Sequence, residues 1–476
     1  MNKMTNSFIL ILIILATFAE LKAMNVTSFE PHKLTVLEDG PAAFQARLKL
    51  IRKAKKFINM EYYILQRDIS SQILIEELIK KSKKGVKVRI LLDNYPLKFT
   101  NFYAAYFKKY KIELKYYNTN TLVKTKIYNY RNHRKVLSID GLEAIIGGRN
   151  IGKEYFELSN KFNFYDRDLL VQGSIVRYID QSFNFFWEHK LSVKPVKIKI
   201  PLRRTRKYTD TDDNIHFKRS LAKAKNFFNF QANRKLIDKT KIKLRKIGNK
   251  QFNSYQTFIC NKTQFVTDGP GRKKSASILG PFLVTELKNA NTHILMETPY
   301  FITLNSDKKL FSTILKKNVD VRLLTNSLRA TDAIHVNTVF DARIGYYIKK
   351  GLKAYAFTGQ SLEKKNLLYT NSDKKPIFGI HSKTYIIDEK KSMVGTLNFD
   401  PRSKNLNAEL AIICHENKEL AALLTKNIEK RMKKSVEIDR HKEYLKKLAP
   451  ELRASFLKKF LTGLVYLPSL VFDELL

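Results

Sequence analysis

The strongest constraint on the fold is a string of residues that occurs twice, nearly half a chain apart. Both copies read H-x-K-x4-D-x6-G-x-x-N, with identical internal spacing. One copy could arise by chance, but two indicate that the chain is built to bring two equivalent strings together. The string consists of His133, Lys135, Asp140 and Asn150 in the first copy, and of His381, Lys383, Asp388 and Asn398 in the second.

Each copy predicts a small polar surface. His and Lys stand two apart before an apolar run, and residues i and i+2 of a β-strand share a face. The Gly-x-x-Asn that follows is typical of a second, adjacent strand end, where Gly lets the backbone approach closely and Asn adds an amide. Each half therefore offers one imidazole, one ammonium group and one amide.

Two such surfaces together suit a phosphodiester. Lysine and asparagine hold the non-bridging oxygens and stabilise the charge that builds on them. One imidazole attacks phosphorus while the other protonates the leaving oxygen, and the ordinary His pKa of about 6.5 allows both forms near neutral pH. A lone His-x-Lys would instead be a solvated strand edge. Protonated lysine is a poor metal ligand and no cluster with zinc spacing lies nearby, so we expect neither metal nor cofactor.

These residues resemble the signature of the phospholipase D superfamily, which is this duplicated histidine–lysine–aspartate string. Residues 147–156 (GGRNIGKEYF), residues 398–403 (NFDPRS) and Asn407-Ala-Glu409 further resemble the bacterial cardiolipin synthases, especially their C-type branch. The resemblance runs from about Leu37 to the C-terminus and is weakest between the halves. It implies two tandem phospholipase D-like α/β sandwich domains related by pseudo-twofold symmetry, with the active site at their interface.

The order of expected elements also repeats. A helix, a glycine and a strand (residues 86–92) in the first half match a helix and strand (residues 319–325) in the second, and a Met-Glu pair recurs at positions 60–61 and 296–297. Alternating helices and strands predict α/β layering. The expected units are a leader (1–23), a first domain (24–190), a basic linker (191–255), a second domain (256–450) and an amphipathic tail (451–476).

Supporting carboxylates follow each string. Asn407-Ala-Glu409 aligns with Asp166-Arg-Asp168, and each segment opens an apolar strand. We therefore expect Glu409 and Asp168 to accept hydrogen bonds from the histidine rings, as the acid of a catalytic triad does. Asp140 and Asp388 belong to the candidate site by their place in the string, but they end strands and are expected to be structural salt-bridge partners.

The net charge of +44 predicts an anionic partner, either a phospholipid surface or nucleic acid, unless it reflects a general bias towards lysine. Residues 190–250 are rich in Lys and Arg, including the run at 203–207. This stretch is either a solvated connection or a basic flap over a membrane or a nucleic acid strand. Its aromatic residues Phe227, Phe228 and Phe230 fit lipid insertion, base stacking or the buried face of a helix.

The two ends of the chain suggest a membrane. Lys3 precedes an apolar run at 8–19, which is shorter than a membrane span and typical of a secretory leader, with an uncleaved anchor as the alternative. We expect a bacterial protein that is exported or attached at the periplasmic face. The tail at 456–476 is either a helix packed on the core or an interfacial anchor. Two cysteines form no disulfide framework, and their pairing is left open.

The leading functional hypothesis is phosphatidyl transfer between phosphatidylglycerol-like lipids, with His133 as nucleophile and His381 as general acid and base. Pseudo-symmetry leaves the opposite assignment open. An exported phospholipase D that hydrolyses its lipid is the nearest alternative. A metal-independent nuclease of the same superfamily and a membrane-binding protein without activity are further ones.

Overall fold

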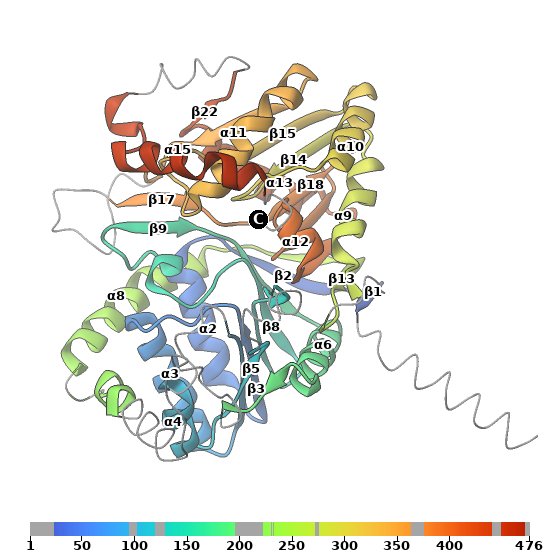
Figure 1. The fold of residues 1–476 in the computed structure, drawn as a ribbon. Helices are drawn as coiled ribbons and strands as arrows, with labels where there is room; N and C mark the ends of the chain where they lie inside the picture. Colours follow the sequence, from blue (N-terminus) through green and yellow to red (C-terminus); the bar gives the residue numbers. More distant parts are fainter. Residues whose placement is uncertain are drawn as a thin grey trace, which may run out of the picture.

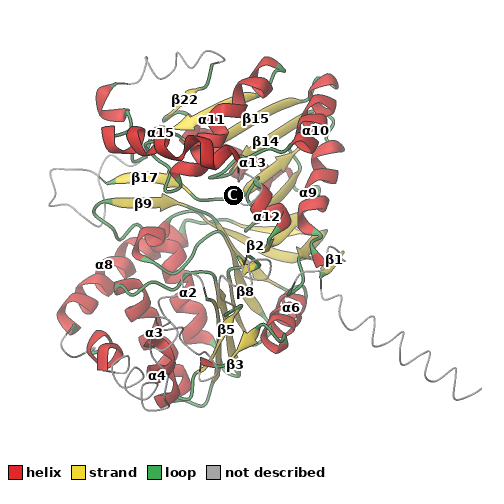
Figure 2. Ribbon diagram, in the orientation of Figure 1, coloured by secondary structure: helices red, strands yellow, loops and turns green. Residues whose placement is uncertain are grey.

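The computed structural model describes residues 23–94, 102–119, 129–195, 222–229, 231, 233–271, 276–362, 376–439 and 449–471. Within these ranges the chain forms two nine-stranded mixed sheets, one per half, covered by helices (Figures 1 and 2). The predicted α/β class with two similar domains is confirmed. The leader, the basic run at 203–207 and Phe230 lie outside the described residues.

The first sheet has, in spatial order, β11 (Ser192–Val193), β5 (Glu113–Tyr117), β4 (Lys87–Asp93), β3 (Phe57–Tyr62), β7 (Val136–Ile139), β8 (Glu143–Gly147), β10 (Asp168–Gln172), β2 (His32–Leu37) and β12 (Thr257–Cys260). Its helices are α2 (Gly40–Lys53), α3 (Ile69–Ser82), α4 (Phe102–Lys109), α6 (Val176–Glu188) and α8 (Arg234–Asn253), with the 3-10 helix η2 (Lys153–Phe156). Helix α6 lies on the opposite side of the sheet from α2, α3 and α4 (Figure 2).

The second sheet repeats this order with β22 (Ser435–Glu437), β16 (Lys353–Phe357), β15 (Asp320–Asn326), β14 (His293–Glu297), β18 (Thr384–Ile387), β19 (Lys391–Gly395), β21 (Leu410–Cys414), β13 (Thr263–Thr267) and β1 (Met24–Ser28). Its helices are α9 (Leu279–Lys288), α10 (Asn305–Lys316), α11 (Ile334–Lys349), α12 (Pro401–Asn405), α13 (Lys418–Met432) and α15 (Phe456–Val471), with η5 (Pro450–Leu452). A shared apolar core, which includes Val36, Val171, Val394 and Ile412, joins the two sheets.

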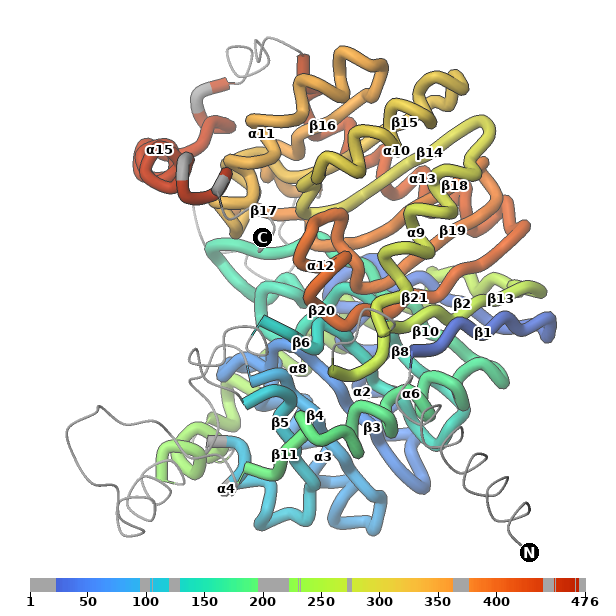
Figure 3. Tube along the Cα trace, turned by 45° about the vertical axis from the view of Figure 1, so that its right-hand side comes forward, coloured from blue at the N-terminus to red at the C-terminus, as the bar shows by residue number. Residues whose placement is uncertain are grey.

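The two halves exchange their outer strands. Strand β1, which the expected boundaries place in the first domain, pairs with β13 of the second sheet. Strand β12, expected in the second domain, pairs with β2 of the first sheet. Each exchanged strand occupies the same position in its sheet, so the chain crosses between the sheets at both points. Figure 3 shows β1 beside β13 of the second sheet.

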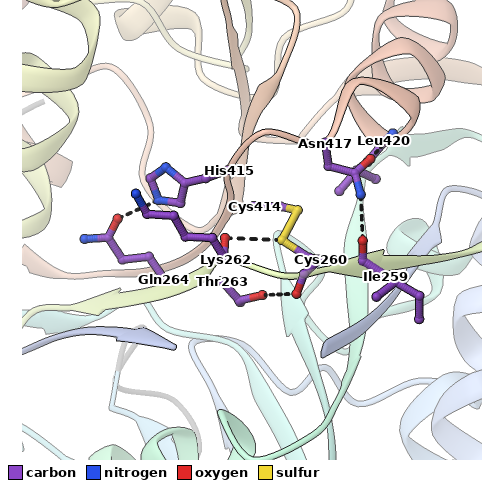
Figure 4. The surroundings of a disulfide bond; sticks show 9 residues. All are labelled: Ile259, Cys260, Lys262, Thr263, Gln264, Cys414, His415, Asn417 and Leu420. Atoms are coloured by element: carbon purple, nitrogen blue, oxygen red, sulfur yellow. Dashed lines mark hydrogen bonds between the residues drawn. A yellow bond between two sulfur atoms is a disulfide. The ribbon is translucent and has the colours of Figure 1, made fainter. Parts of the chain in front are cut away.

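A disulfide bond links the two sheets at the exchanged strand β12. Cys260 at the end of β12 is bonded to Cys414 at the end of β21, so the bond connects the first sheet to the second (Figure 4). Both cysteines are buried. The bond closes a sequence separation of 154 residues, which restricts the unfolded chain more than a short loop would.

Local sequence accounts for the repeated helix–strand turns. Gly85 after α3 has φ 85° and Gly351 after α11 has φ 105°, which is the left-handed conformation that glycine adopts without a Cβ penalty. Each glycine turns the chain directly into a parallel strand, β4 and β16 respectively. The predicted turn at Gly85 is confirmed.

Two further details concern the first domain. Helix α2 is confined to Gly40–Lys53, because Leu37 ends β2 and Phe57 begins β3. Of the three alternatives for the aromatic residues, Phe228 follows the buried one, since it packs in the core and stacks on Tyr106 with ring centroids 4.2 Å apart. None of the helices in the described part of the chain is long and apolar enough to cross a bilayer.

Candidate active site

Each His-x-Lys lies in a short extended link between two strands, rather than on the strand itself. His133 and Lys135 stand between β6 (Arg131–Asn132) and β7. His381 and Lys383 stand between β17 (Ile377–Ile380) and β18. The Gly-x-x-Asn segments leave the ends of β8 and β19, which are hydrogen-bonded to β7 and β18 as expected.

Two short parallel strand pairs join the halves at these links. Strand β6 pairs with β20 (Asn407–Ala408), and β17 pairs with β9 (Phe162–Tyr165). The backbone N–H of His133 donates to the carbonyl of Ala408 at 3.0 Å, and that of His381 donates to the carbonyl of Tyr165 at 2.7 Å. In each pair, the residue that follows the accepting carbonyl is a carboxylate from the opposite half.

These carboxylates hold the histidine rings. Nδ1 of His133 lies 2.9 Å from each carboxylate oxygen of Glu409. Nδ1 of His381 lies 2.6 Å from Oδ2 of Asp166. With Nδ1 engaged in this way, the Nε2 atom of each ring is the one left for proton transfer or attack on phosphorus.

The expectation that Asp168 would hold a histidine is therefore wrong. Strand pairing places Asp168 opposite Gly147, the position that Ala411 takes opposite Gly395 in the second half. Asp168 instead accepts hydrogen bonds from the buried guanidinium groups of Arg47 at 2.9 Å and Arg149 at 3.1 Å. The counterpart of Glu409 is Asp166, two residues earlier.

The two lysines of the string are buried beside their histidines. Nζ of Lys135 donates to the carbonyl of His133 at 2.6 Å, and Nζ of Lys383 donates to the carbonyl of His381. Nζ of Lys383 also lies 3.0 Å from Nδ1 of His381. Burial lowers the pKa of both lysines, most strongly at Lys135. An anion that enters between them would restore their charged forms.

The two asparagines differ. Nδ2 of Asn150 donates to the hydroxyl of Tyr155 at 3.0 Å, and its Oδ1 accepts from the backbone of Ile64 at 3.2 Å. The Oδ1 atom of Asn398 is buried and has no hydrogen-bond partner. A buried acceptor without a partner costs free energy, so Oδ1 of Asn398 is left to accept a hydrogen bond from a donor such as a hydroxyl group.

Asp140 and Asp388 each bind the backbone of a turn. Asp140 accepts the backbone N–H groups of residues 55–57 at 2.7–2.8 Å. Asp388 accepts those of residues 291–293 at 2.8–3.2 Å. Each carboxylate thus fixes the turn before β3 or β14. The expected salt bridges are replaced by these backbone hydrogen bonds, because the turn presents three N–H groups that have no partner in a strand.

The two histidines differ in how far their pKa values are lowered. Burial and the charges of Lys135 and Lys383 lower the pKa of His133 well below its ordinary value. Burial and Lys383 also lower the pKa of His381, but the charge and hydrogen bond of Asp166 oppose that shift. The downward shift of the pKa is therefore larger for His133 than for His381.

The two carboxylates that hold the histidines, Glu409 and Asp166, also differ in pKa. Burial, opposed by the charge of Lys135, raises the pKa of Glu409 to about 7. Burial would raise the pKa of Asp166 as well, but His381 and Lys383 hold it well below its usual range. Asp166 is thus the carboxylate that keeps its negative charge more readily.

Sequence reasoning missed the aromatic rings that pack on the histidines. The Tyr63 ring lies 5.0 Å from that of His133, and the Tyr155 and Phe164 rings each lie 5.1 Å from that of His381. Tyr63 follows the repeated Met-Glu pair closely, which was the available signal. No pattern in the sequence marked Phe164.

The glutamates of the two Met-Glu pairs each bind a residue that is adjacent in sequence to a site residue. Glu61 accepts a hydrogen bond from Nδ2 of Asn132 at 2.6 Å, next to His133. Glu297 pairs at 2.7 Å with Arg167, which follows Asp166 in the chain. Within the described ranges, no group of three or more His, Cys, Asp and Glu side chains is placed to hold a metal ion.

Comparisons with known proteins identify the family of this chain. The sequence profile described as "Cardiolipin synthase, PLD-like domain" matches residues 48–187 and 283–432. An uncharacterized protein of Helicobacter pylori (strain ATCC 700392 / 26695) is 30% identical over 401 residues, which are 79% of this chain and 75% of that protein. Cardiolipin synthase C of Escherichia coli K12 is 27% identical over 404 residues, 82% of each chain.

The fold is also found among solved structures. The crystal structure of phosphatidylserine synthase from Haemophilus influenzae superposes with a TM-score of 0.64 over 93% of this chain and 95% of that one, at 14% sequence identity. The profile matches cover more than half of the sequence and include both histidine strings. The predicted resemblance is confirmed: the chain is an enzyme of the phospholipase D superfamily and belongs to the family of cardiolipin synthase, PLD-like domains.

Proposed function

We propose that this enzyme transfers the phosphatidyl group of a phosphatidylglycerol-like lipid to a second lipid alcohol, through a phosphohistidine. The observation that carries the proposal is that each histidine is held through Nδ1 by a carboxylate of the other half. Two oriented imidazoles, one neutral and one more readily protonated, are what a two-step displacement at phosphorus needs.

In the first step, Nε2 of His133 attacks phosphorus and the bond from phosphorus to the glycerol oxygen breaks. The departing oxygen takes the proton of His381 and leaves as glycerol. Lys135 and Lys383, both buried beside the histidines, neutralise the charge on the phosphate oxygens. The low pKa of His133 supports its assignment as the neutral nucleophile.

In the second step, His381 accepts the proton of an incoming hydroxyl group. The new oxygen–phosphorus bond forms, and the bond from phosphorus to His133 breaks. A second phosphatidylglycerol as the acceptor gives cardiolipin, whereas water gives phosphatidic acid. The similarity to cardiolipin synthase C supports the lipid acceptor.

The same proposal includes a location outside the cytoplasm or at its membrane. The buried Cys260–Cys414 disulfide supports it, since disulfides persist in oxidising compartments and are rare in the reducing cytosol.

The test is incubation of the purified full chain with phosphatidylglycerol vesicles in the absence of divalent metal. Cardiolipin and glycerol from the wild type, and none from His133→Ala or His381→Ala, are the expected products. Phosphatidic acid alone would identify a hydrolase. Absence of any lipid product, with cleavage of single-stranded DNA in a parallel reaction, would reject the lipid substrate in favour of a nuclease.

A further inference from the structure

Helix α15 carries an apolar strip that faces solvent. Phe456, Leu457, Phe460 and Leu464 are 85%, 63%, 54% and 61% exposed. At 100° per residue these four side chains fall within one sector of the helix. A contiguous exposed apolar strip indicates an interaction site, whereas single exposed apolar side chains do not.

The opposite face of α15 fixes the helix on the second domain, beside α11 (Figure 1). Nζ of Lys458 donates to the carbonyls of Leu328, Arg329 and Thr331 at 3.1, 3.0 and 2.7 Å. Ser469 lies on the same face and is buried, and Leu470 beside it packs against the buried cluster of Ile302, Val336 and Val339. The strip therefore points outward because the inner face is already occupied.

This attachment connects α15 to the active site. The loop that Lys458 binds leaves β15 at Asn326, whose side chain donates to the carbonyl of Ile380 at 2.8 Å and accepts from its N–H at 2.7 Å. Ile380 directly precedes His381. The helix is therefore bound to the loop that holds the backbone beside this histidine.

Cations accompany the strip. Lys459 is exposed on α15, and it lines a cavity of about 220 Å³ together with Arg329 and Arg453, with Asp341 as the acidic residue of the lining. The chain as a whole carries +44. An apolar strip flanked by Lys and Arg matches an anionic bilayer, in which acyl chains lie beneath negative headgroups.

We propose that α15 docks in the interfacial region of an anionic phospholipid bilayer, with Phe456, Leu457, Phe460 and Leu464 among the acyl chains and the active site opened towards the headgroups. This inference rests on the proposed lipid substrate. It adds the surface through which the enzyme receives that substrate, and it accounts for a one-sided helix that no other described element covers.

The test places one tryptophan in the strip of the full chain. Phe460→Trp is compared with Leu142→Trp, whose parent side chain is 66% exposed in the turn after β7, at the far end of that strand from His133. Vesicles contain phosphatidylglycerol with brominated acyl chains, and the wild-type signal of Trp187 is subtracted. We expect quenching of Phe460→Trp and none of Leu142→Trp. Quenching reports one side chain, so attachment through another segment does not imitate it.

A second variant links docking to turnover. Leu457→Ser/Phe460→Ser/Leu464→Ser should lower the vesicle partition coefficient more than roughly tenfold, since three large apolar side chains no longer enter the bilayer. Leu142→Ser should leave it unchanged. The triple variant should lose activity on vesicles and keep it on dispersed short-chain phosphatidylglycerol.

Unquenched Phe460→Trp on vesicle-bound protein, equal quenching at both positions, or burial of the strip in a dimer of two copies would each overturn the docking. Wild-type protein inactive on both lipid forms would reject the proposed function, while the quenching experiment would still decide the docking.

Discussion

Nδ1 of His381 lies 2.6 Å from Oδ2 of Asp166, a carboxylate that comes from the other half of the chain. His133 has the same relationship with Glu409 in the opposite direction. Neither half therefore contains a complete catalytic pair, and the site exists only where the two halves meet.

Replacing Asp166→Asn should lower kcat roughly 1,000- to 10,000-fold, as loss of the orienting acid does in catalytic triads. Asp166 also opposes the downward shift of the His381 pKa, so its removal lowers that pKa further. Protonated His381 is needed in the first step. The alkaline limb of the pH–rate profile should therefore move to lower pH, which kcat measured across pH on phosphatidylglycerol will show.

Asp168→Asn is the matched control, two residues away. It leaves the buried Arg47 and Arg149 without their carboxylate, so we expect a loss of about 3–5 kcal/mol in the free energy of unfolding. The folded fraction should retain the wild-type pH profile. A shifted profile in Asp168→Asn and an unshifted one in Asp166→Asn would contradict the assignment.

Gly148→Ala adds only a methyl group, and it should inactivate the enzyme by displacing the carboxylate of Asp166. A Cβ at this position would stand 2.1 Å from Oδ1 of Asp166, so the carboxylate must leave His381. Gly463→Ala, whose Cβ meets no atom within 4 Å, is the control and should keep full activity. Parallel activity assays and circular dichroism separate displacement of the carboxylate from unfolding; wild-type kcat in Gly148→Ala would refute the contact.

Asp140→Ala and Asp388→Ala should lower stability rather than catalysis, by about 1–3 kcal/mol each for the hydrogen bonds removed. Burial opposes the shift at both carboxyls, but the backbone N–H donors lower the pKa. A lowered folded pKa gives stability above the unfolded pKa of about 3.9, and that stability is lost as pH falls through the folded value. Urea unfolding should show a difference from the wild type that narrows below about pH 4. A drop in kcat with unchanged stability would indicate chemistry instead.

Cys414→Ser should cost about 2–5 kcal/mol of stability, because the Cys260–Cys414 bond joins the exchanged strand β12 to the second sheet. Thermal unfolding with and without reductant provides the measurement. Reductant should lower the wild-type Tm to that of the variant and leave the variant unaffected. An oxidised wild type with the same Tm as Cys414→Ser would show that the bond contributes nothing.

The duplicated string predicts most of the site. His133, His381 and their lysines carry a fixed spacing, and the Met-Glu pairs and the turn at Gly85 repeat in order, so local rules were enough to predict them. These features depend on residues close together in the chain, where periodicity and turn chemistry are informative.

The remaining features depend on contacts between distant segments. Asp166 and Asp168 are two apart, and residues two apart share a strand face, so the pattern does not distinguish them. Only the pairing of β9 with β17 shows that Asp166 reaches His381. The exchange of β1 and β12, and with it the Cys260–Cys414 bond, likewise follows from the assembled sheets rather than from any local signal.

The most direct test of the central claim uses a phosphatidyl p-nitrophenyl ester, whose leaving group departs without a proton. His381→Ala then completes the first step but lacks the base for the second. We expect a burst of one nitrophenolate per enzyme and a phosphatidyl group on His133, mapped by mass spectrometry after an alkaline quench, while His133→Ala gives no burst. A burst from His133→Ala, with the label on His381, would contradict the assignment of the nucleophile.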